Sequence, residues 1–252
     1  MNADRKLPTV SIVTPTYRRQ PFMEQLLRCV RLQDYPQSLI ETIILDDSPE
    51  PLVLREEWTD GLNVRLIRSN AKVPLGEKRN RLNRFADGKI IVAFDDDDYY
   101  PSTRVSHAVE MLQSSGMKLA GSSLLLMWFV AADRLAALGP FHDRHSCNGA
   151  FAYTSGYARR HAYDAGAGDR EEPSFTRNYT EPMVQLDSVK TMLAIAHHEN
   201  TVPKTNEAMT QCLLPDPVRF PGLTQSNWLD LVPDEESRAF YRRQFAIGSA
   251  SR

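Results

Sequence analysis

Apolar residues in the first 115 positions alternate between strand-like runs and helical spacing, and this alternation constrains the fold most. Short β-rich runs stand at residues 9–14, 41–45, 64–67 and 89–94. Between the first two runs, apolar residues from Met23 to Val30 recur at i, i+3, i+4 and i+7, which predicts a helix. Two further helices are expected over residues 76–88 and 105–112. The pattern predicts an α/β fold with a mostly parallel, doubly wound (Rossmann-like) sheet.

The rest of the chain has a weaker pattern. Residues 118–132 are apolar, 164–173 suit a mobile loop, 192–196 suit a strand and 235–245 suit an amphipathic helix. We expect a single domain over residues 1–252. It would divide into a first half at about 8–115, a mixed half at about 116–214 and a tail at about 215–252.

Composition excludes several classes of protein. A net charge of -2 gives no general attraction to nucleic acid. Three cysteines, Cys29, Cys147 and Cys212, stand far apart and suit neither a disulfide framework nor a zinc site. The apolar run from Leu124 to Ala132 is too short to span a bilayer. We expect a cytoplasmic protein with no membrane span; peripheral attachment to a membrane and the oligomeric state stay open.

Four consecutive aspartates, Asp95 to Asp98, follow the apolar run at 89–94. Carboxylates fixed together at a strand end repel one another and favour a bound cation. Their hard oxygen atoms suit Mg²⁺ or Mn²⁺, which leave coordination positions for diphosphate oxygens. If extended geometry continued, Asp95 and Asp97 would point one way and Asp96 and Asp98 the other. A solvated acidic turn is the alternative, and we weigh it lower because the preceding strand is fully apolar.

Two other polar groups belong to the same predicted sheet edge. Asp46 and Asp47 follow the second strand; alone they suit a turn or a helix cap, but beside the other strand ends they suit a nucleobase or ribose contact. Lys78 and Arg79 lie at a predicted helix start, which favours phosphate, with a solvated helix face as the alternative. The sequence contains neither a Walker-type loop nor a three-glycine dinucleotide fingerprint.

The motifs TVSIVTPTYRR, IILDDS and GEKRNRLNRFADGKIIVAFDDDDYYP, in this order over about residues 8–101, resemble the donor half of family 2 glycosyltransferases. The resemblance implies a GT-A fold whose first half binds a nucleotide sugar and whose mixed half binds the acceptor. With Lys78 added from the helix start, the residues expected at the donor are Thr14, Pro15, Thr16, Tyr17, Asp46, Asp47, Lys78, Arg79, Asp95 and Asp96. The resemblance also implies that Asp97, in the DxD motif, binds the metal.

The later half resembles the family more weakly. Members carry a catalytic carboxylate beside the acceptor, often in a Glu-Asp pair, and here the nearest candidates are Glu171 and Glu172. The alternatives are Asp164, Asp169 and Asp187. A histidine after a late strand resembles the additional metal ligand of some GT-A enzymes, which favours His197 over His198; a polar strand end is the alternative.

The resemblance implies a metal-dependent, inverting, hexosyltransferase-like enzyme. It would move a sugar from a nucleotide-sugar donor, UDP-linked by family habit, to a hydroxyl of a glycan, lipid-linked or protein acceptor. A nucleotidyltransferase is one alternative, although the turn TPTYRRQP lacks the glycine-rich loop of that class. A catalytically inactive nucleotide-sugar-binding module is another. Trp128 suits either stacking on a sugar or packing in the core.

Overall fold

Two β-sheets organise the computed structural model, which describes residues 6–200 and 228–245. The larger sheet has the strand order β3 (Val64–Arg68), β2 (Ile40–Asp46), β1 (Val10–Thr16), β4 (Ile90–Ala93), β8 (Ala152–Thr154), β5 (Leu119–Gly121) and β9 (Val184–Gln185). The smaller sheet has the order β10 (Leu193–Ala196), β6 (Leu125–Phe129) and β7 (Arg134–Leu138). Strands β1 to β4 are parallel, whereas β8 runs antiparallel to β4 and β5.

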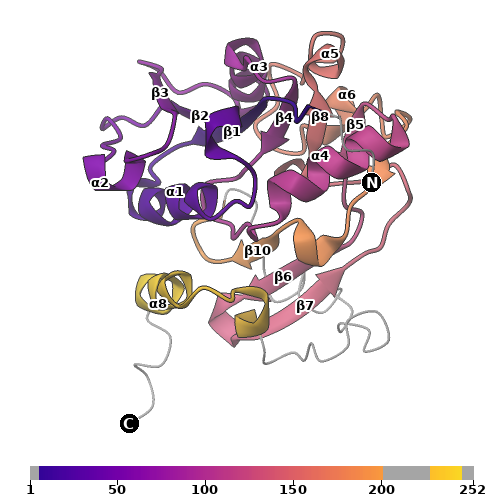
Figure 1. The fold of residues 1–252 in the computed structure, drawn as a ribbon. Helices are drawn as coiled ribbons and strands as arrows, with labels where there is room; N and C mark the ends of the chain where they lie inside the picture. Colours follow the sequence, from indigo (N-terminus) through magenta and orange to yellow (C-terminus); the bar gives the residue numbers. More distant parts are fainter. Residues whose placement is uncertain (1–5, 201–227, 246–252) are drawn as a thin grey trace.

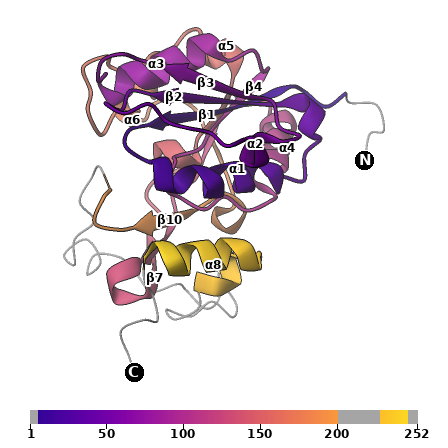
Figure 2. The same ribbon diagram turned by 90° about the vertical axis from the view of Figure 1, so that its left-hand side faces the viewer.

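Helices cover both faces of the larger sheet (Figure 1). One face carries α3 (Leu75–Phe85) and α5 (Ser155–Ala158), and the other carries α1 (Met23–Arg31) and α4 (Arg104–Ser115), as Figure 2 shows. The remaining α-helices are α2 (Glu56–Thr59), α6 (Glu172–Phe175) and α8 (Glu235–Gln244). Short 3-10 helices are η1 (Gln20–Phe22), η2 (Gln37–Leu39), η3 (Val130–Ala132), η4 (Asn148–Ala150), η5 (Ser188–Lys190) and η6 (Trp228–Leu231). No helix within the described ranges is long and apolar enough to cross a bilayer.

Strand β4 shows why its sequence is almost continuously apolar. Ile90 and Val92 pack into the core that contains α1 and α4, whereas Ile91 and Ala93 pack into the core beneath α3. Successive side chains of a strand point to opposite faces, so a strand covered on both faces needs apolar residues at every position. The predicted parallel, doubly wound first half is therefore confirmed.

The second half contains elements that the sequence pattern did not resolve. The apolar stretch at 118–132 divides into β5 and β6, which enter different sheets. The break falls at Ser122, whose backbone N–H donates to Ser146 Oγ at 3.0 Å. Trp128 in β6 is fully buried and stacks on Trp228, with ring centroids 4.0 Å apart. Of the two roles considered for Trp128, the structure therefore shows core packing.

The two sheets are joined by the segment that follows β4 in the sequence. The backbone of Tyr99 exchanges two hydrogen bonds with Leu193 of β10, at 3.1 and 2.9 Å. One residue earlier, Asp98 Oδ1 accepts a hydrogen bond from Ile195 N at 2.8 Å. The last residue of the acidic run therefore fixes the smaller sheet to the tip of β4.

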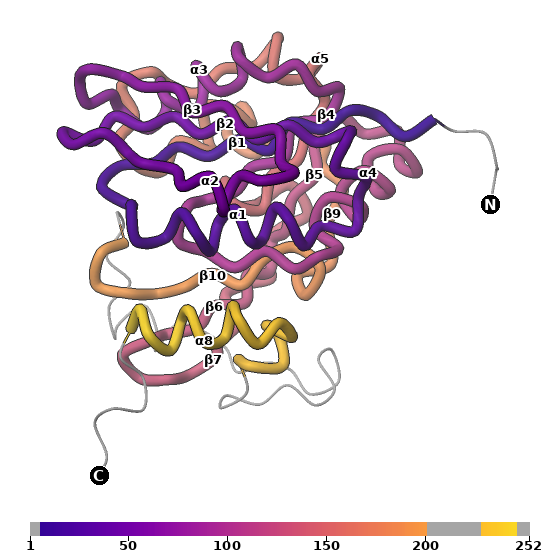
Figure 3. Tube along the Cα trace, turned by 60° about the vertical axis from the view of Figure 1, so that its left-hand side comes forward, coloured from indigo at the N-terminus to yellow at the C-terminus, as the bar shows by residue number. Residues whose placement is uncertain are grey.

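Helix α8 lies beside the smaller sheet and α1 (Figure 3). Asp234 caps it by accepting from Ser237 N at 2.9 Å, and the same carboxylate receives two hydrogen bonds from Arg28 of α1, at 2.7 and 3.0 Å. The predicted amphipathic segment at 235–245 is thus a helix. Cys29 and Cys147 are free thiols, and Cys212 lies outside the described residues.

Candidate active site

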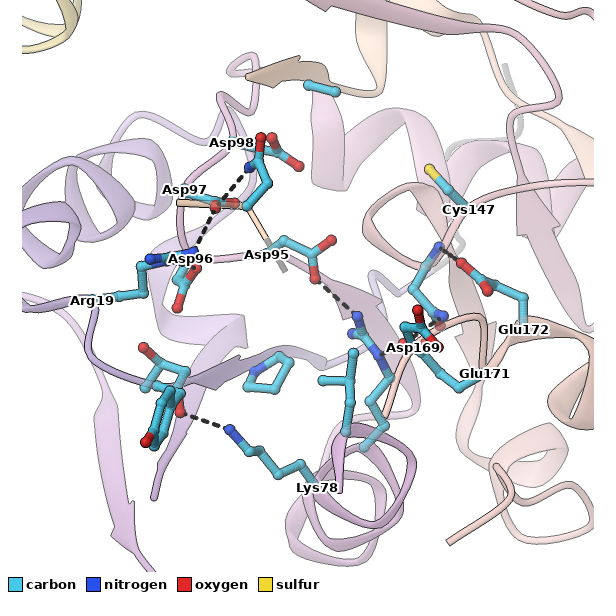
Figure 4. A pocket seen from close by; sticks show the side chains of 18 of the residues that line it. Arg19, Lys78, Asp95, Asp96, Asp97, Asp98, Cys147, Asp169, Glu171 and Glu172 are labelled. Carbon is cyan, nitrogen blue, oxygen red and sulfur yellow. Dashed lines mark hydrogen bonds and ion pairs between the residues drawn. The ribbon is translucent and has the colours of Figure 1, made fainter. Parts of the chain in front are cut away.

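A pocket of about 570 Å³ opens at the carboxyl ends of β1 and β4 (Figure 4). Its walls are the turn after β1, the start of α3, the acidic run after β4 and the segments at 169–172 and 199–200. Ten of the residues predicted for the site line it, namely Pro15, Thr16, Tyr17, Lys78, Arg79, Asp95, Asp96, Asp97, Glu171 and Glu172. Parallel strands end at one sheet edge, which explains why residues far apart in sequence meet here.

The acidic run bends instead of continuing as a strand, because β4 ends at Ala93. The expected alternation of aspartate directions therefore does not apply. Asp95 Oδ1 lies 3.1 Å from Arg79 Nη2. Asp96 and Asp97 both lie near the Arg19 guanidinium, with nitrogen–oxygen distances of 3.7 and 3.6 Å. The bend thus directs three consecutive carboxylates toward cationic side chains.

The carboxylates of the run carry an electrostatic cost. Burial raises the pKa of Asp95, and the neighbouring charge of Asp97 raises it further, while Arg79 lowers it. Burial also raises the pKa of Asp96 well above its usual range, again with a contribution from Asp97. Carboxylates with raised pKa values are those whose negative charge is under-compensated. A bound cation would relieve this cost.

Asp97 and His197 form the candidate metal site. His197 Nε2 lies 3.1 Å from Asp97 Oδ2, and Asn200 Nδ2 lies 3.2 Å from the same oxygen. His197 directly follows β10, and its ring stacks on that of Phe22 with the centroids 5.4 Å apart. Within the described ranges, no group of three or more His, Cys, Asp or Glu is arranged around a common ion position. Two donors still suit Mg²⁺ or Mn²⁺ that takes its other ligands from phosphate and water.

Arg79 connects the acidic run with the opposite wall. Its side chain is 8% exposed, and its Nε lies 2.6 Å from Glu171 Oε1. Asn148 Nδ2 donates to the same oxygen at 2.9 Å, and Tyr163 Oη donates to Asn148 Oδ1 at 2.8 Å. Two donors therefore hold Glu171 Oε1, and these bonds disfavour Glu171 as the group that accepts a proton.

Glu172 is the other glutamate predicted as a candidate base. It is the first residue of α6, and its Oε1 accepts a hydrogen bond from Asn148 N at 3.2 Å. Burial raises its pKa, and the adjacent charge of Glu171 adds to the effect. A raised pKa brings a carboxylate closer to the pH at which it can accept a proton efficiently. Among the two predicted glutamates, the geometry favours Glu172.

Asp46, the last residue of β2, and Asp47, which follows it, are not among the residues that line the pocket. Asp46 is fully buried and accepts from Ser48 N, Leu52 N and Arg68 Nη1, at 2.9, 3.0 and 2.6 Å. Asp47 Oδ1 lies 2.5 Å from Lys78 Nζ. Asp46 thus organises the turn after β2, which is the turn role considered above.

Lys78 reaches across to β1 as well as to β2. Its Nζ donates to the backbone oxygen of Thr16 at 2.9 Å, and burial lowers its pKa. Thr14 lies within β1 and is fully buried. Lys78 therefore connects the ends of both strands while its side chain still borders the pocket.

The segment before Glu171 packs against the start of α3. Gly76 N donates to Ala167 O at 2.9 Å, and a Cβ added to Gly76 would lie 1.9 Å from Asp164 O. Only glycine permits this approach. Of the alternative bases, Asp169 borders the pocket, whereas Asp164 and Asp187 make local turn and cap contacts.

Three further residues make contacts in the site that the sequence did not predict. Arg19 and Asn200 contact Asp97, and Asn148 contacts both glutamates. Arg19 follows the predicted Pro-Thr-Tyr turn, so a basic residue there was detectable in principle. The other two depend on how distant loops fold back.

Comparison with known proteins agrees with this arrangement. Residues 11–124 match the family model described as Glycosyl transferase family 2. These residues, somewhat less than half of the chain, are a glycosyl transferase family 2 segment. The segment includes most of β1, all of β2 and β4, and the acidic run that lines the pocket. No curated protein matches the chain.

Solved structures resemble the chain in fold. Residues 1–349 of S. aureus TarS, solved in complex with UDP-GlcNAc, match with 18% identity and a TM-score of 0.61, over 77% of this chain and 60% of that one. The mannosyltransferase PcManGT from Pyrobaculum calidifontis, in complex with GDP-Man and Mn2+, matches with 15% identity and a TM-score of 0.59, over 78% of this chain and 59% of that one. The match thus covers about 60% of the length of each of these two chains. The likeness establishes a GT-A type of fold.

Proposed function

We propose that this protein is a metal-dependent, inverting glycosyltransferase that uses a nucleotide-sugar donor, with UDP as the leading nucleotide. The observation that carries the proposal is the meeting of Asp95 to Asp97 and Glu172 across one pocket, at the strand ends of a family 2 segment. The bound UDP-GlcNAc of TarS and the GDP-Man and Mn2+ of PcManGT support the donor and metal classes.

The chain's own residues would divide the work between the two walls. Asp97 and His197 would hold a divalent cation, and Tyr17 would lie at the nucleotide end of the pocket. When bound, the cation would neutralise charge on the departing diphosphate. Arg79 and Asn148 fix Glu171, and Asn148 N also positions Glu172.

Glu172 would accept the proton of the acceptor hydroxyl as the hydroxyl oxygen attacks the anomeric carbon. The acidic run and Glu172 lie on opposite walls in Figure 4, which suits attack from the side opposite the diphosphate and hence inversion. The acceptor would be a hydroxyl-bearing glycan, lipid-linked sugar or protein.

The test measures nucleoside diphosphate release from a panel of UDP- and GDP-sugars, with and without Mn²⁺, against mixed acceptors. Asp97→Asn should lose most turnover and most Mn²⁺-dependent nucleotide affinity, whereas Glu172→Gln should lose turnover and keep nucleotide affinity. Asp87→Asn is the matched control, because Asp87 is 85% exposed and pairs with Arg65 on the surface.

Three outcomes would count against the proposal. Release of pyrophosphate would instead indicate a nucleotidyltransferase. Nucleotide binding without turnover by any sugar in the panel would indicate an inactive binding module. Full activity in Asp97→Asn would remove the metal assignment.

A further inference from the structure

The Arg19 guanidinium lies among three carboxylates, those of Asp96, Asp97 and Glu199. Its Nε lies 3.7 Å from Asp96 Oδ1, its Nη2 lies 3.6 Å from Asp97 Oδ2, and its Nη1 lies 3.7 Å from Glu199 Oε2. The guanidinium also donates to the backbone oxygen of Glu199 and lies 5.8 Å from the centre of the Phe22 ring. Only 12% of the side chain is exposed. Arg19 is therefore held at this position by several independent contacts.

The Arg19 guanidinium approaches the same oxygen that the candidate metal site uses. Asp97 Oδ2 is the atom contacted by Arg19, by His197 Nε2 and by Asn200 Nδ2. A divalent ion bound to that oxygen would repel a guanidinium beside it. The two cations therefore compete for one carboxylate.

Arg19 also borders the pocket, where a donor's phosphates would lie under the proposed function. An arginine released from Asp97 can pair with phosphate oxygens through its planar fork of N–H donors. Before donor binding, the Arg19 guanidinium compensates the charges of Asp96 and Asp97. After donor binding, the phosphates add negative charge that can accommodate both this guanidinium and the ion.

We propose that Arg19 is an internal counter-ion that blocks divalent-ion binding at Asp97 until a nucleotide diphosphate draws its guanidinium away. This inference rests on the proposed function, since it assumes that the ion and the nucleotide share the pocket. It adds an order of binding: the ion binds weakly alone and tightly with nucleotide. Arg19 is thus a positioning residue that couples two ligands.

The test is the affinity for Mn²⁺, measured by calorimetry in the absence of nucleotide and again with saturating UDP. Arg19→Gln should bind Mn²⁺ alone about tenfold more tightly than the wild type, because the competitor is gone. The gain in Mn²⁺ affinity on adding UDP should shrink by a similar factor, about tenfold. Arg19→Lys keeps the charge without the planar fork and should fall between the two.

Arg18→Gln is the matched control. It removes the same charge one residue away, where the guanidinium lies 5.3 Å from the Tyr17 ring centre and not on the aspartates. Its Mn²⁺ affinity without nucleotide should stay within about twofold of the wild type, since a more distant charge is screened. Thermal unfolding of each variant confirms that the fold is intact.

The outcomes separate this inference from the proposed function. If Arg19→Gln binds Mn²⁺ alone no more tightly than Arg18→Gln, while the wild type binds Mn²⁺ with UDP, the counter-ion role is refuted and the glycosyltransferase proposal stands. If the wild type binds no Mn²⁺ even with UDP, both the metal dependence and the role of Arg19 are refuted.

Discussion

Replacing Arg79 by Met should destabilise the fold and not only the site. Arg79 Nε lies 2.6 Å from Glu171 Oε1, and its Nη2 lies 3.1 Å from Asp95 Oδ1. The substitution keeps a helix-favouring side chain of similar length in α3 but removes the cation between two carboxylates. Glu171 is only 4% exposed, so it would be left with an uncompensated charge, whereas Asp95 keeps 29% exposure toward the pocket.

Most of the cost should therefore arise at Glu171. Removing one partner of a buried ion pair costs about 3–5 kcal/mol. Asn148 still donates one hydrogen bond to Glu171, so we expect a loss of about 3 kcal/mol, at the lower end of that range. The control is Arg81→Met in the same helix, because Arg81 is 38% exposed and pairs with Glu77 four residues away. That surface pair should contribute about 0.5 kcal/mol or less.

Urea denaturation at pH 8 and pH 5 provides the measurement. In the wild type, Arg79 opposes the rise in the pKa of Asp95 that burial causes. Without Arg79, that pKa rises further above its unfolded value, so the folded variant is penalised at high pH and recovers as the pH falls. The deficit should thus be smaller at pH 5. Equal losses for Arg79→Met and Arg81→Met, or a deficit independent of pH, would refute the reasoning.

Three further predictions concern the proposed base Glu172, the N-cap of α8 and Trp228 in η6. Burial raises the pKa of Glu172, and a base must be deprotonated to act. As the pH is lowered, turnover should therefore begin to fall at a higher pH than it would with an ordinary glutamate. A pH–rate profile of the wild type and of Glu172→Gln tests this. Asp234→Ala should lower the free energy of unfolding by about 1–2 kcal/mol at pH 7. Hydrogen bonds from Arg28 hold the pKa of Asp234 well below its usual range. This stabilisation is therefore complete above the unfolded pKa, and urea denaturation should show it decreasing steadily as the pH falls from that value toward the folded pKa. Trp228→Ala should cost about 3–5 kcal/mol in thermal or urea unfolding, because its buried ring stacks on Trp128; a loss below 1 kcal/mol would contradict this.

The fold of the first half of the chain was predictable because the apolar residues of its strands and helices repeat with regular periods. The run at 89–94 is apolar on both faces, and the helix from Met23 repeats at 3.6 residues, so local pattern and tertiary burial agree. Motif order then placed Asp95 and Arg79 at one edge, where the structure brings them within 3.1 Å.

The second half depends on long-range pairing that no local period encodes. Strand β5 has three residues and β9 has two, too short for alternation to be visible. The environment of Asp46 was equally hidden: its acceptors are satisfied by Ser48, Leu52 and Arg68, and only the folded turn shows this. A carboxylate's role depends on which donors reach it, which is a tertiary property.

Asp98 and Tyr99 have a consequence for how such proteins can diversify. They bond the backbone of β10 to the segment after β4, and His197 directly follows β10. These bonds therefore fix the position of His197 relative to the aspartates. Insertions in the surface loops of the second half would leave the spacing between histidine and aspartate undisturbed. Under the proposed function, new acceptor preferences can therefore arise while the proposed ion and donor sites stay unaltered.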